Sequence, residues 1–321
     1  MISHSTLGAP RRSLALIICL ALAACADGLP NLGLSCGADP GTPLPVAMSG
    51  PAMVVKVRIN DVPQTFMIDT GGARSVIERR SALAMGLMHK ISSVVVQDVA
   101  GQRSVDVVGV DRLRIGEFTF DDQQLLIGDG LPIDGIIGLD ILARFDLDID
   151  EPHGRMSVYR HGLCKGVSPN IGAPMLEMEA IRGIRDAKDP FTGTAPFLMV
   201  AAKLNGVYSL AMLDTGALGG SIVSQRFADA AGVTNDKLGG DTQIPTKGLG
   251  PRINLARHRF EALDIGGELF ERPYLLVSPD PDARFPMVLG HDYFLTHRVW
   301  FNFASDRVFS VPAQPRIAPK G

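Results

Sequence analysis

The sequence contains the tripeptide Asp-Thr-Gly twice, at residues 69–71 and 214–216, and each copy follows a run of apolar residues. Two carboxylates held about 3 Å apart share one proton, because both cannot easily be charged at that distance. The charged carboxylate can act as general base on a water molecule, while the protonated one donates to a carbonyl oxygen. If the fold brings Asp69 and Asp214 together, the pair can hydrolyse an amide bond without a metal or a nucleophilic side chain.

The residues that follow each aspartate suit this chemistry. Gly71 and Gly216 let the backbone turn tightly, and their N–H groups can hydrogen-bond a carboxylate. Thr70 and Thr215 offer hydroxyl groups that can hold the two loops together. A single copy could equally be a turn in which Asp69 only caps its own loop. Two copies in equivalent surroundings favour the catalytic interpretation.

The two copies lie within a longer internal repeat. Residues 59–71 align with residues 204–216 without a gap, at a shift of 214 − 69 = 145 positions. Residues 136–142 align with residues 288–294 at a shift of 288 − 136 = 152 positions, so the shift grows by only a few residues. Repeated blocks in the same order indicate two related lobes. Short apolar runs bounded by turn residues predict that both lobes are mostly β.

The elements around these blocks are short. Helices are expected at residues 78–85 and 224–231. Asp140 and Asp292 occupy equivalent positions in the repeat, and we interpret each as the cap of a short helix that follows a glycine. Each of these helices would then begin just after an apolar-apolar-Gly step.

A strand with alternating apolar and acidic residues follows the first of these helices. Asp146, Asp148 and Asp150 alternate with Phe145 and other apolar side chains. This period of two is typical of a half-buried strand. We therefore expect the three carboxylates on a solvated face.

At this point the sequence resembles the aspartic protease family, and above all its retropepsin-like members, here as one chain with two lobes. The family signature is an apolar-apolar-Asp-Thr-Gly loop, followed later by an apolar-apolar-Gly segment that packs beneath it in a ψ-shaped loop. The second element is present twice and ends in Gly138 and Gly290. The resemblance covers about residues 41–312. It implies two acid-protease-like β-barrel lobes related by a pseudo-twofold axis, with the active site between them.

The resemblance also implies a role for each motif residue. Asp69 and Asp214 would be the catalytic pair, and the hairpin around Gly101 would be a flap over the substrate. Gly72 stands where the family usually has Ala or Ser, so the first loop is expected to be looser. The other implied roles belong to the loop residues and to a second flap: Thr70 and Thr215 as a hydroxyl grip, Gly71 and Gly216 as N–H donors, and residues 247–251 as the second flap.

The N-terminal residues have the features of a targeting segment. Arg11 and Arg12 precede an apolar stretch at residues 14–24 that is too short to span a bilayer. Residues 22–25 resemble the lipobox of bacterial lipoproteins, which implies cleavage before Cys25 and a lipid on its sulfur. Ordinary signal cleavage after the Ala-x-Ala site Ala24-Cys25-Ala26 stays open as the alternative. Either cleavage exports the protein, and we expect a periplasmic or cell-envelope location with an anchor at Cys25.

Two cysteines remain in the exported chain, Cys36 and Cys164. An oxidising compartment would allow a disulfide between them, and two separate thiols are the alternative. The full division of the chain is then as follows: signal peptide 1–24, N-terminal tether 25–40, lobe 1 at 41–164, linker and insertion 165–195, lobe 2 at 196–312, and tail 313–321.

The composition excludes several classes of protein. A net charge of −3 and a pI near 6.2 leave no electrostatic footprint for nucleic acid. The apolar runs are all shorter than the roughly 20 residues of a membrane-spanning helix. The seven histidines show no metal-ligand spacing, and the sequence has no P-loop and no Gly-x-Ser-x-Gly motif. We therefore expect no metal, no cofactor and no nucleic-acid partner.

These observations predict an exported aspartic endopeptidase that cleaves extended peptides or unstructured protein segments. Because one chain supplies both halves of the site, a monomer suffices. The alternative is a protease-like module of the cell envelope that binds peptides with little or no turnover.

Overall fold

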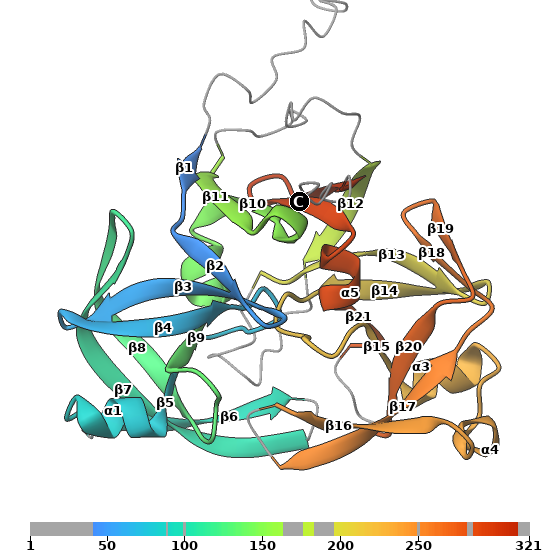
Figure 1. Cartoon of the computed structure of the whole chain (residues 1–321), viewed down its shortest axis with the longest axis horizontal. Coiled ribbons are helices and arrows are strands. Elements are labelled where there is room, and N and C mark those ends of the chain that lie inside the picture. Colours follow the sequence, from blue (N-terminus) through green and yellow to red (C-terminus); the bar gives the residue numbers. More distant parts are fainter. Residues whose placement is uncertain are drawn as a thin grey trace, which may run out of the picture.

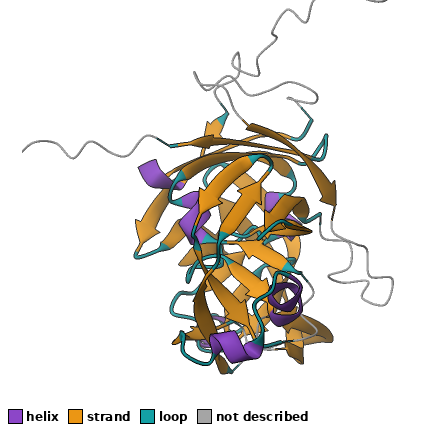
Figure 2. Cartoon of the chain, turned by 90° about the vertical axis from the view of Figure 1, so that its right-hand side faces the viewer, coloured by secondary structure: helices purple, strands orange, loops and turns teal. Residues whose placement is uncertain are grey.

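A computed structural model describes most of the chain, namely residues 41–87, 89–98, 101–162, 176–182, 196–248, 251–280 and 285–313. The predictions for the signal peptide, the tether, Cys25, Cys36 and Cys164 lie outside these ranges. None of the described helices is long and apolar enough to cross a membrane. Strands dominate the described chain, and its helices are all short (Figure 2).

Lobe 1 occupies one side of the molecule in Figure 1 and ends in a hairpin above it. Its elements in chain order are β1 (Thr42–Pro43), β2 (Val46–Ser49), β3 (Ala52–Ile59), β4 (Val62–Ile68), β5 (Val76–Glu78), α1 (Arg79–Ala84), β6 (Lys90–Asp98), β7 (Gly101–Ile115), β8 (Phe118–Gly128), β9 (Gly135–Ile137), α2 (Leu139–Leu142), β10 (Phe145–Asp150), the 3₁₀ helix η2 (Glu151–His153) and β11 (Arg155–Arg160).

Lobe 2 repeats this series on the other side of the molecule. Its elements are β12 (Leu176–Arg182), β13 (Leu198–Leu204), β14 (Val207–Leu213), β15 (Ile222–Ser224), α3 (Gln225–Ala230), α4 (Asn235–Leu238), β16 (Thr242–Lys247), β17 (Arg252–Arg259), β18 (Ala262–Ile265), β19 (Glu268–Glu271), β20 (Tyr274–Ser278), β21 (Met287–Leu289), α5 (His291–Phe294), β22 (His297–Asn302) and β23 (Arg307–Pro312). The fold is therefore mostly β and two-lobed, as the sequence predicts.

The two predicted helices are confirmed as α1 and α3. Glu78 precedes α1, and its carboxylate accepts a hydrogen bond from the backbone N–H of Arg80. Ser224 precedes α3 and accepts one from Phe227 at 3.2 Å. Side-chain oxygens at this position satisfy N–H groups that the first helical turn leaves free, which fixes where each helix begins.

In each lobe, a short strand from late in the sequence inserts between two early ones. In lobe 1, β9 pairs in parallel with β4 and antiparallel with β5, so that Ile137 lies beside Ile68. In lobe 2, β21 makes the same two pairings with β14 and β15, and Leu289 lies beside Leu213. All four of these side chains are buried, which sets the register. This ψ-shaped pairing places the end of the inserted strand directly beside each Asp-Thr-Gly loop.

A bridging sheet joins the lobes, with strand order β1-β11-β10-β22-β23-β12. The central strands β10 and β22 pair with Asp148 opposite Trp300. Those two residues are 300 − 148 = 152 positions apart, the same shift that relates the ψ-loops, so they are equivalent in the repeat. The pseudo-twofold axis therefore passes between them. Strand β12 belongs to this sheet because it pairs with β23, so residues 176–182 are strand rather than linker.

The expectation that the acidic strand faces solvent is wrong. Asp146, Asp148 and Asp150 are 0%, 5% and 4% exposed, because β10 lies in the middle of the bridging sheet rather than at a surface. Asp148 accepts a hydrogen bond from Arg298 of lobe 2 at 2.8 Å. Asp146 accepts one from the backbone N–H of Phe303 at 3.0 Å. Two of the three carboxylates thus bind groups of the opposite lobe.

Candidate active site

The two Asp-Thr-Gly loops contact each other through their threonines. The backbone N–H of Thr70 donates to Oγ1 of Thr215, and the N–H of Thr215 donates to Oγ1 of Thr70, both at 3.1 Å. The Thr70 hydroxyl donates to the carbonyl of Leu213, and the Thr215 hydroxyl donates to the carbonyl of Ile68, both at 2.9 Å. Both threonines are almost fully buried. These four reciprocal bonds hold the loops in one relative position.

Asp69 and Asp214 lie side by side, and their carboxyl groups are hydrogen-bonded to each other. Each glycine of the motif leaves room for the opposite aspartate. A Cβ on Gly71 would lie 2.1 Å from Cγ of Asp214, and a Cβ on Gly216 would lie 2.6 Å from Cγ of Asp69. The opposite carboxyl therefore occupies the space of a side chain. This close approach is what requires glycine at these two positions.

Backbone N–H groups of each loop bind the carboxylate of that loop. Oδ1 of Asp69 accepts hydrogen bonds from Gly71 at 2.9 Å and from Gly72 at 2.8 Å. Oδ1 of Asp214 accepts one from Gly216 at 2.7 Å, and the N–H of Ala217 also stabilises this carboxylate. Gly72 thus donates directly to Asp69, and a Cβ there would lie only 2.9 Å from its Oδ2. The loop is closely packed at this residue rather than loose.

Burial and mutual contact shift the pKa values of the two carboxyl groups to different extents. Burial raises the pKa of Asp69, while hydrogen bonds from Asp214, Gly72 and Gly71 lower it in part. Burial raises the pKa of Asp214 well above its usual value, and the nearby charge of Asp69 raises it further. The charge of Asp69 adds to the effect of burial on the pKa of Asp214, which favours the protonated form of Asp214 and the charged form of Asp69.

The strands that lead into the ψ-loops hydrogen-bond the backbone of both aspartates. The backbone N–H of Asp69 donates to the carbonyl of Ile137 at 3.0 Å, and that of Asp214 donates to Leu289 at 2.9 Å. A Cβ on Gly138 would lie 2.6 Å from the backbone of Arg74, so only glycine permits this approach. A Cβ on Gly290 would likewise lie 2.5 Å from the backbone of Gly220, in the segment that follows the second motif.

Asp140 and Asp292 are not the N-caps of α2 and α5, because those positions are Gly138 and Gly290, which have no side-chain cap. Each aspartate lies in the first turn and accepts a hydrogen bond from the next N–H, that of Ile141 at 3.1 Å or of Tyr293 at 3.0 Å. Asp140 also accepts hydrogen bonds from the hydroxyl of Ser75 at 2.7 Å and from its N–H at 2.9 Å. The same hydroxyl accepts one from the N–H of Gly138 at 3.1 Å. Each aspartate therefore ties the far end of its loop to the ψ-loop.

Lobe 2 repeats this connection through Ser221. Its hydroxyl donates to Asp292 at 2.7 Å and accepts from the N–H of Gly290 at 3.0 Å. The available sequence signal was a serine shortly after each Asp-Thr-Gly motif and an aspartate two residues after each ψ-loop glycine. Sequence reasoning missed the connection because it joins residues about 70 positions apart.

Two hairpins extend from the lobes toward each other below the loops in Figure 1. In lobe 1, β6 and β7 pair as far as Gly101, which lies opposite Asp98 at the end of the hairpin. In lobe 2, β16 and β17 pair as far as Lys247 and Arg252. Nζ of Lys247 donates to the carbonyl of Asp129 at 3.2 Å, so the lobe 2 hairpin contacts lobe 1. Nothing in the sequence pattern predicted this contact.

Within the described residues, no group of three or more His, Cys, Asp or Glu side chains could hold a metal ion. The polar groups of the site are carboxyls, hydroxyls and backbone amides. That set can bind and polarise a water molecule and a carbonyl group.

Comparisons with known proteins found a family model and a solved structure that are similar to this chain. A family model described as "Aspartyl protease" matches residues 55–141 and 200–293, which together exceed half of the chain. A solved structure of a retropepsin-like aspartic protease from Rickettsia conorii is similar, with 21% sequence identity and a TM-score of 0.31. The match covers 36% of this chain and 88% of that one. The search of curated proteins found no match. On the evidence of both matched segments, the chain belongs to the aspartyl protease family.

Proposed function

We propose that the protein is an exported aspartic endopeptidase that hydrolyses peptide bonds with a water molecule held between Asp69 and Asp214. The observation that carries this proposal is the pair of buried carboxyl groups that the reciprocal threonine bonds hold side by side. The pKa of Asp214 is raised by burial and by the charge of Asp69, so Asp69 is the charged member and the general base. Asp214 holds the proton and is the general acid.

The reaction balances with these two groups alone. The water oxygen attacks the carbonyl carbon, Asp69 takes a proton from the water, and Asp214 gives its proton to the carbonyl oxygen. The tetrahedral diol then collapses: Asp69 gives its proton to the amide nitrogen, the C–N bond breaks, and Asp214 recovers a proton from the hydroxyl. The threonine bonds and the ψ-loop glycines, Gly138 and Gly290, fix the distance between the carboxyls throughout.

The substrate would be an extended peptide or an unstructured protein segment, bound largely through its main chain. The hairpin that ends near Gly101 and the hairpin β16–β17 would cover it. We further propose that the exported protein acts in the periplasm or cell envelope as a monomer, anchored by a lipid on Cys25. The apolar residues 14–24 and the lipobox-like residues 22–25 support this location.

The test is cleavage of casein from pH 3 to 7 by the exported chain, beside Asp69→Asn and Asp214→Asn. Each substitution should lower kcat by about 10³-fold, because a positioned proton-transfer group contributes on that scale. Asp122→Asn, on an exposed residue of lobe 1, is the matched control and should keep full activity. A folded Asp214→Asn variant with unreduced activity contradicts the proposal. Peptide binding by the natural chain without cleavage at any pH also contradicts it, and favours a binding module.

A further inference from the structure

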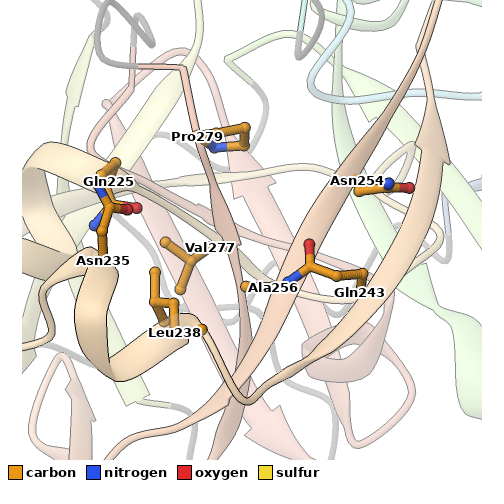
Figure 3. A pocket seen from close by; sticks show the side chains of 9 residues that line it. Gln225, Asn235, Leu238, Gln243, Asn254, Ala256, Val277 and Pro279 are labelled. Carbon is orange, nitrogen blue, oxygen red and sulfur yellow. The ribbon is translucent and has the colours of Figure 1, made fainter.

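Lobe 2 contains a pocket away from the two aspartates. It lies between helices α3 and α4 on one side and the hairpin β16–β17 on the other, above β20 (Figure 3). Its volume is about 230 Å³. The lining consists of Gln225, Asn235, Leu238, Gly239, Gln243, Asn254, Ala256, Val277 and Pro279.

The lining combines carboxamides with an apolar surface and includes no charged or aromatic side chain. Four of the nine residues carry a carboxamide, and each carboxamide offers both N–H donors and a carbonyl acceptor. The apolar surface comes from Leu238, Ala256, Val277 and Pro279. Within the described chain, the side chains of Asn235 and Asn254 have no hydrogen-bond partner. They are therefore available to a ligand.

Charged side chains occupy equivalent positions in lobe 1. The strand pairings match at a shift of 150 positions: Val107 lies opposite Leu126, as Arg257 lies opposite Leu276. By the same shift, Ala256 corresponds to Asp106 (256 − 150) and Pro279 to Asp129 (279 − 150).

Those lobe 1 residues form ion pairs. Asp129 accepts from the guanidinium of Arg79 at 3.1 Å, and Asp106 pairs with Lys90 at 2.8 Å. Arg79 begins α1 as Gln225 begins α3, so it corresponds to Gln225 of the pocket. Lobe 2 thus has neutral residues at three positions where lobe 1 has a charge cluster.

The inserted helix α4 completes the pocket. Lobe 1 runs directly from α1 to β6, whereas lobe 2 places α4 between α3 and β16. Helix α4 supplies Asn235 and the buried side chain of Leu238 to the lining. Two differences from lobe 1, the loss of three charges and the gain of a helix, therefore shape this pocket in lobe 2.

We propose that this pocket binds a neutral segment of a peptide, with an aliphatic side chain against the apolar surface and the flanking main-chain amides on the carboxamides. Each peptide unit carries one donor and one acceptor, which the carboxamides complement. A volume of about 230 Å³ is below the usual range for a drug-sized ligand and suits one or two residues. The absence of an aromatic ring from the lining disfavours a sugar, whose ring faces pack well on aromatic side chains.

The pocket also lies between helix α4 and the hairpin that is the proposed second flap. Gln243 and Asn254 lie on the hairpin β16–β17, and Asn235 lies on α4, so a bound peptide bridges them. The same hairpin contacts lobe 1 through Lys247. Peptide binding in this pocket does not depend on the proposed function. The identification of the bound peptide as a distant part of the protease substrate does rest on it.

The test is an NMR titration of the ¹⁵N-labelled Asp214→Asn chain with N-acetyl-Ala-Leu-methylamide. This variant separates binding from cleavage, so a failed proteolysis assay leaves the result interpretable. Backbone resonances of residues 235–239 and of the hairpin should shift and saturate. Gln243→Ala and Asn254→Ala remove exposed carboxamides and should each weaken binding by about tenfold, which is about 1.4 kcal/mol.

Gln124→Ala is the matched control, because Gln124 is an exposed carboxamide of lobe 1 outside the pocket, and binding should be unchanged. The charged probe N-acetyl-Ala-Glu should bind less well than the neutral one. Linear, unsaturated shifts, or equal affinity in Gln243→Ala and Asn254→Ala, overturn the proposal. Saturable binding of N-acetylglucosamine in preference to the peptide overturns it in favour of a sugar site.

Discussion

The loops that carry Asp69 and Asp214 have the same backbone plan but different local partners. Both follow a buried strand, both contact the other loop through a threonine, and both rest on a ψ-loop glycine. Asp69 accepts N–H bonds from Gly71 and Gly72, and Gly216 and Ala217 donate to Asp214 at the equivalent positions. The duplicated backbone creates a shared-proton pair, and the loops differ in side chain at the residue after each motif, which is glycine beside Asp69 and alanine beside Asp214.

The glycines of the motif offer the strongest way to break this pair. Gly71→Ala would place a methyl group 2.1 Å from Cγ of Asp214, and Gly216→Ala one 2.6 Å from Cγ of Asp69. The carboxyls must then separate, and a misplacement of about 1 Å can cost about 10²-fold in rate. We expect a loss of at least that size in casein cleavage, with Gly71→Ala the more severe. Gly240→Ala, which meets no atom within 4 Å, is the control and should keep its activity.

The threonines test the symmetry of the pair. Thr70→Val and Thr215→Val each remove two buried hydrogen bonds of equal length. Each should lower the free energy of unfolding by about 2–4 kcal/mol, because an unsatisfied buried group costs about 1–3 kcal/mol. Urea denaturation measures both variants against Thr119→Val, whose side chain is exposed. Clearly unequal losses would show that the two lobes do not share this contact equally.

The pH dependence of stability tests the asymmetry. Because the pKa of Asp214 is raised in the folded chain, the folded state holds its proton where the unfolded state has lost it. Stability from this group is therefore present below the unfolded pKa and is lost as the pH rises through the folded pKa. An asparagine has no proton to lose in this range, so Asp214→Asn removes this pH-dependent loss of stability. Its melting temperature should exceed that of the natural chain at pH 7, and the difference should be smaller at pH 3.

The melting temperature of Asp214→Asn is best compared with that of the equivalent substitution at Asp69. Asp69→Asn also removes the mutual repulsion, but it gives up N–H bonds to a charged carboxylate, so it should gain less than Asp214→Asn. A difference of about 2 °C or more is readable, since it corresponds to about 1 kcal/mol in a chain of this size. A larger gain for Asp69→Asn would place the proton on Asp69 instead.

Short sequence patterns predicted the strands, the helix starts and the repeat, because these depend on residues close together in the chain. The apolar runs before each Asp-Thr-Gly, the helix starts at Glu78 and Ser224, and the two-lobed β fold all follow from short patterns and their repetition. The contact between the two loops was expected from the repeat, because equivalent segments meet at a pseudo-twofold axis.

What sequence reasoning missed depends on which elements pack together. The carboxylate of Asp148 is buried because β10 pairs with β22 across the axis, and alternation alone cannot show that a strand is covered on both sides. The bonds from Ser75 to Asp140 join distant segments. The lobe 2 pocket exists because charges are absent, and an absent ion pair leaves no motif.

The smallest expected effect concerns Gly72, where the lobes differ most locally. A methyl group there would lie 2.9 Å from Oδ2 of Asp69, whereas lobe 2 has Ala217 at the equivalent place. Gly72→Ala should push the Asp69 carboxylate away from the N–H that stabilises its charge, which raises its pKa further. The acidic limb of the kcat profile should then move to higher pH, with a loss at its optimum of less than about tenfold, or about 1.4 kcal/mol. Ala217→Gly is the mirror control and should leave that limb in place; equal shifts in both variants would mean that crowding of the Asp69 carboxylate does not set its pKa.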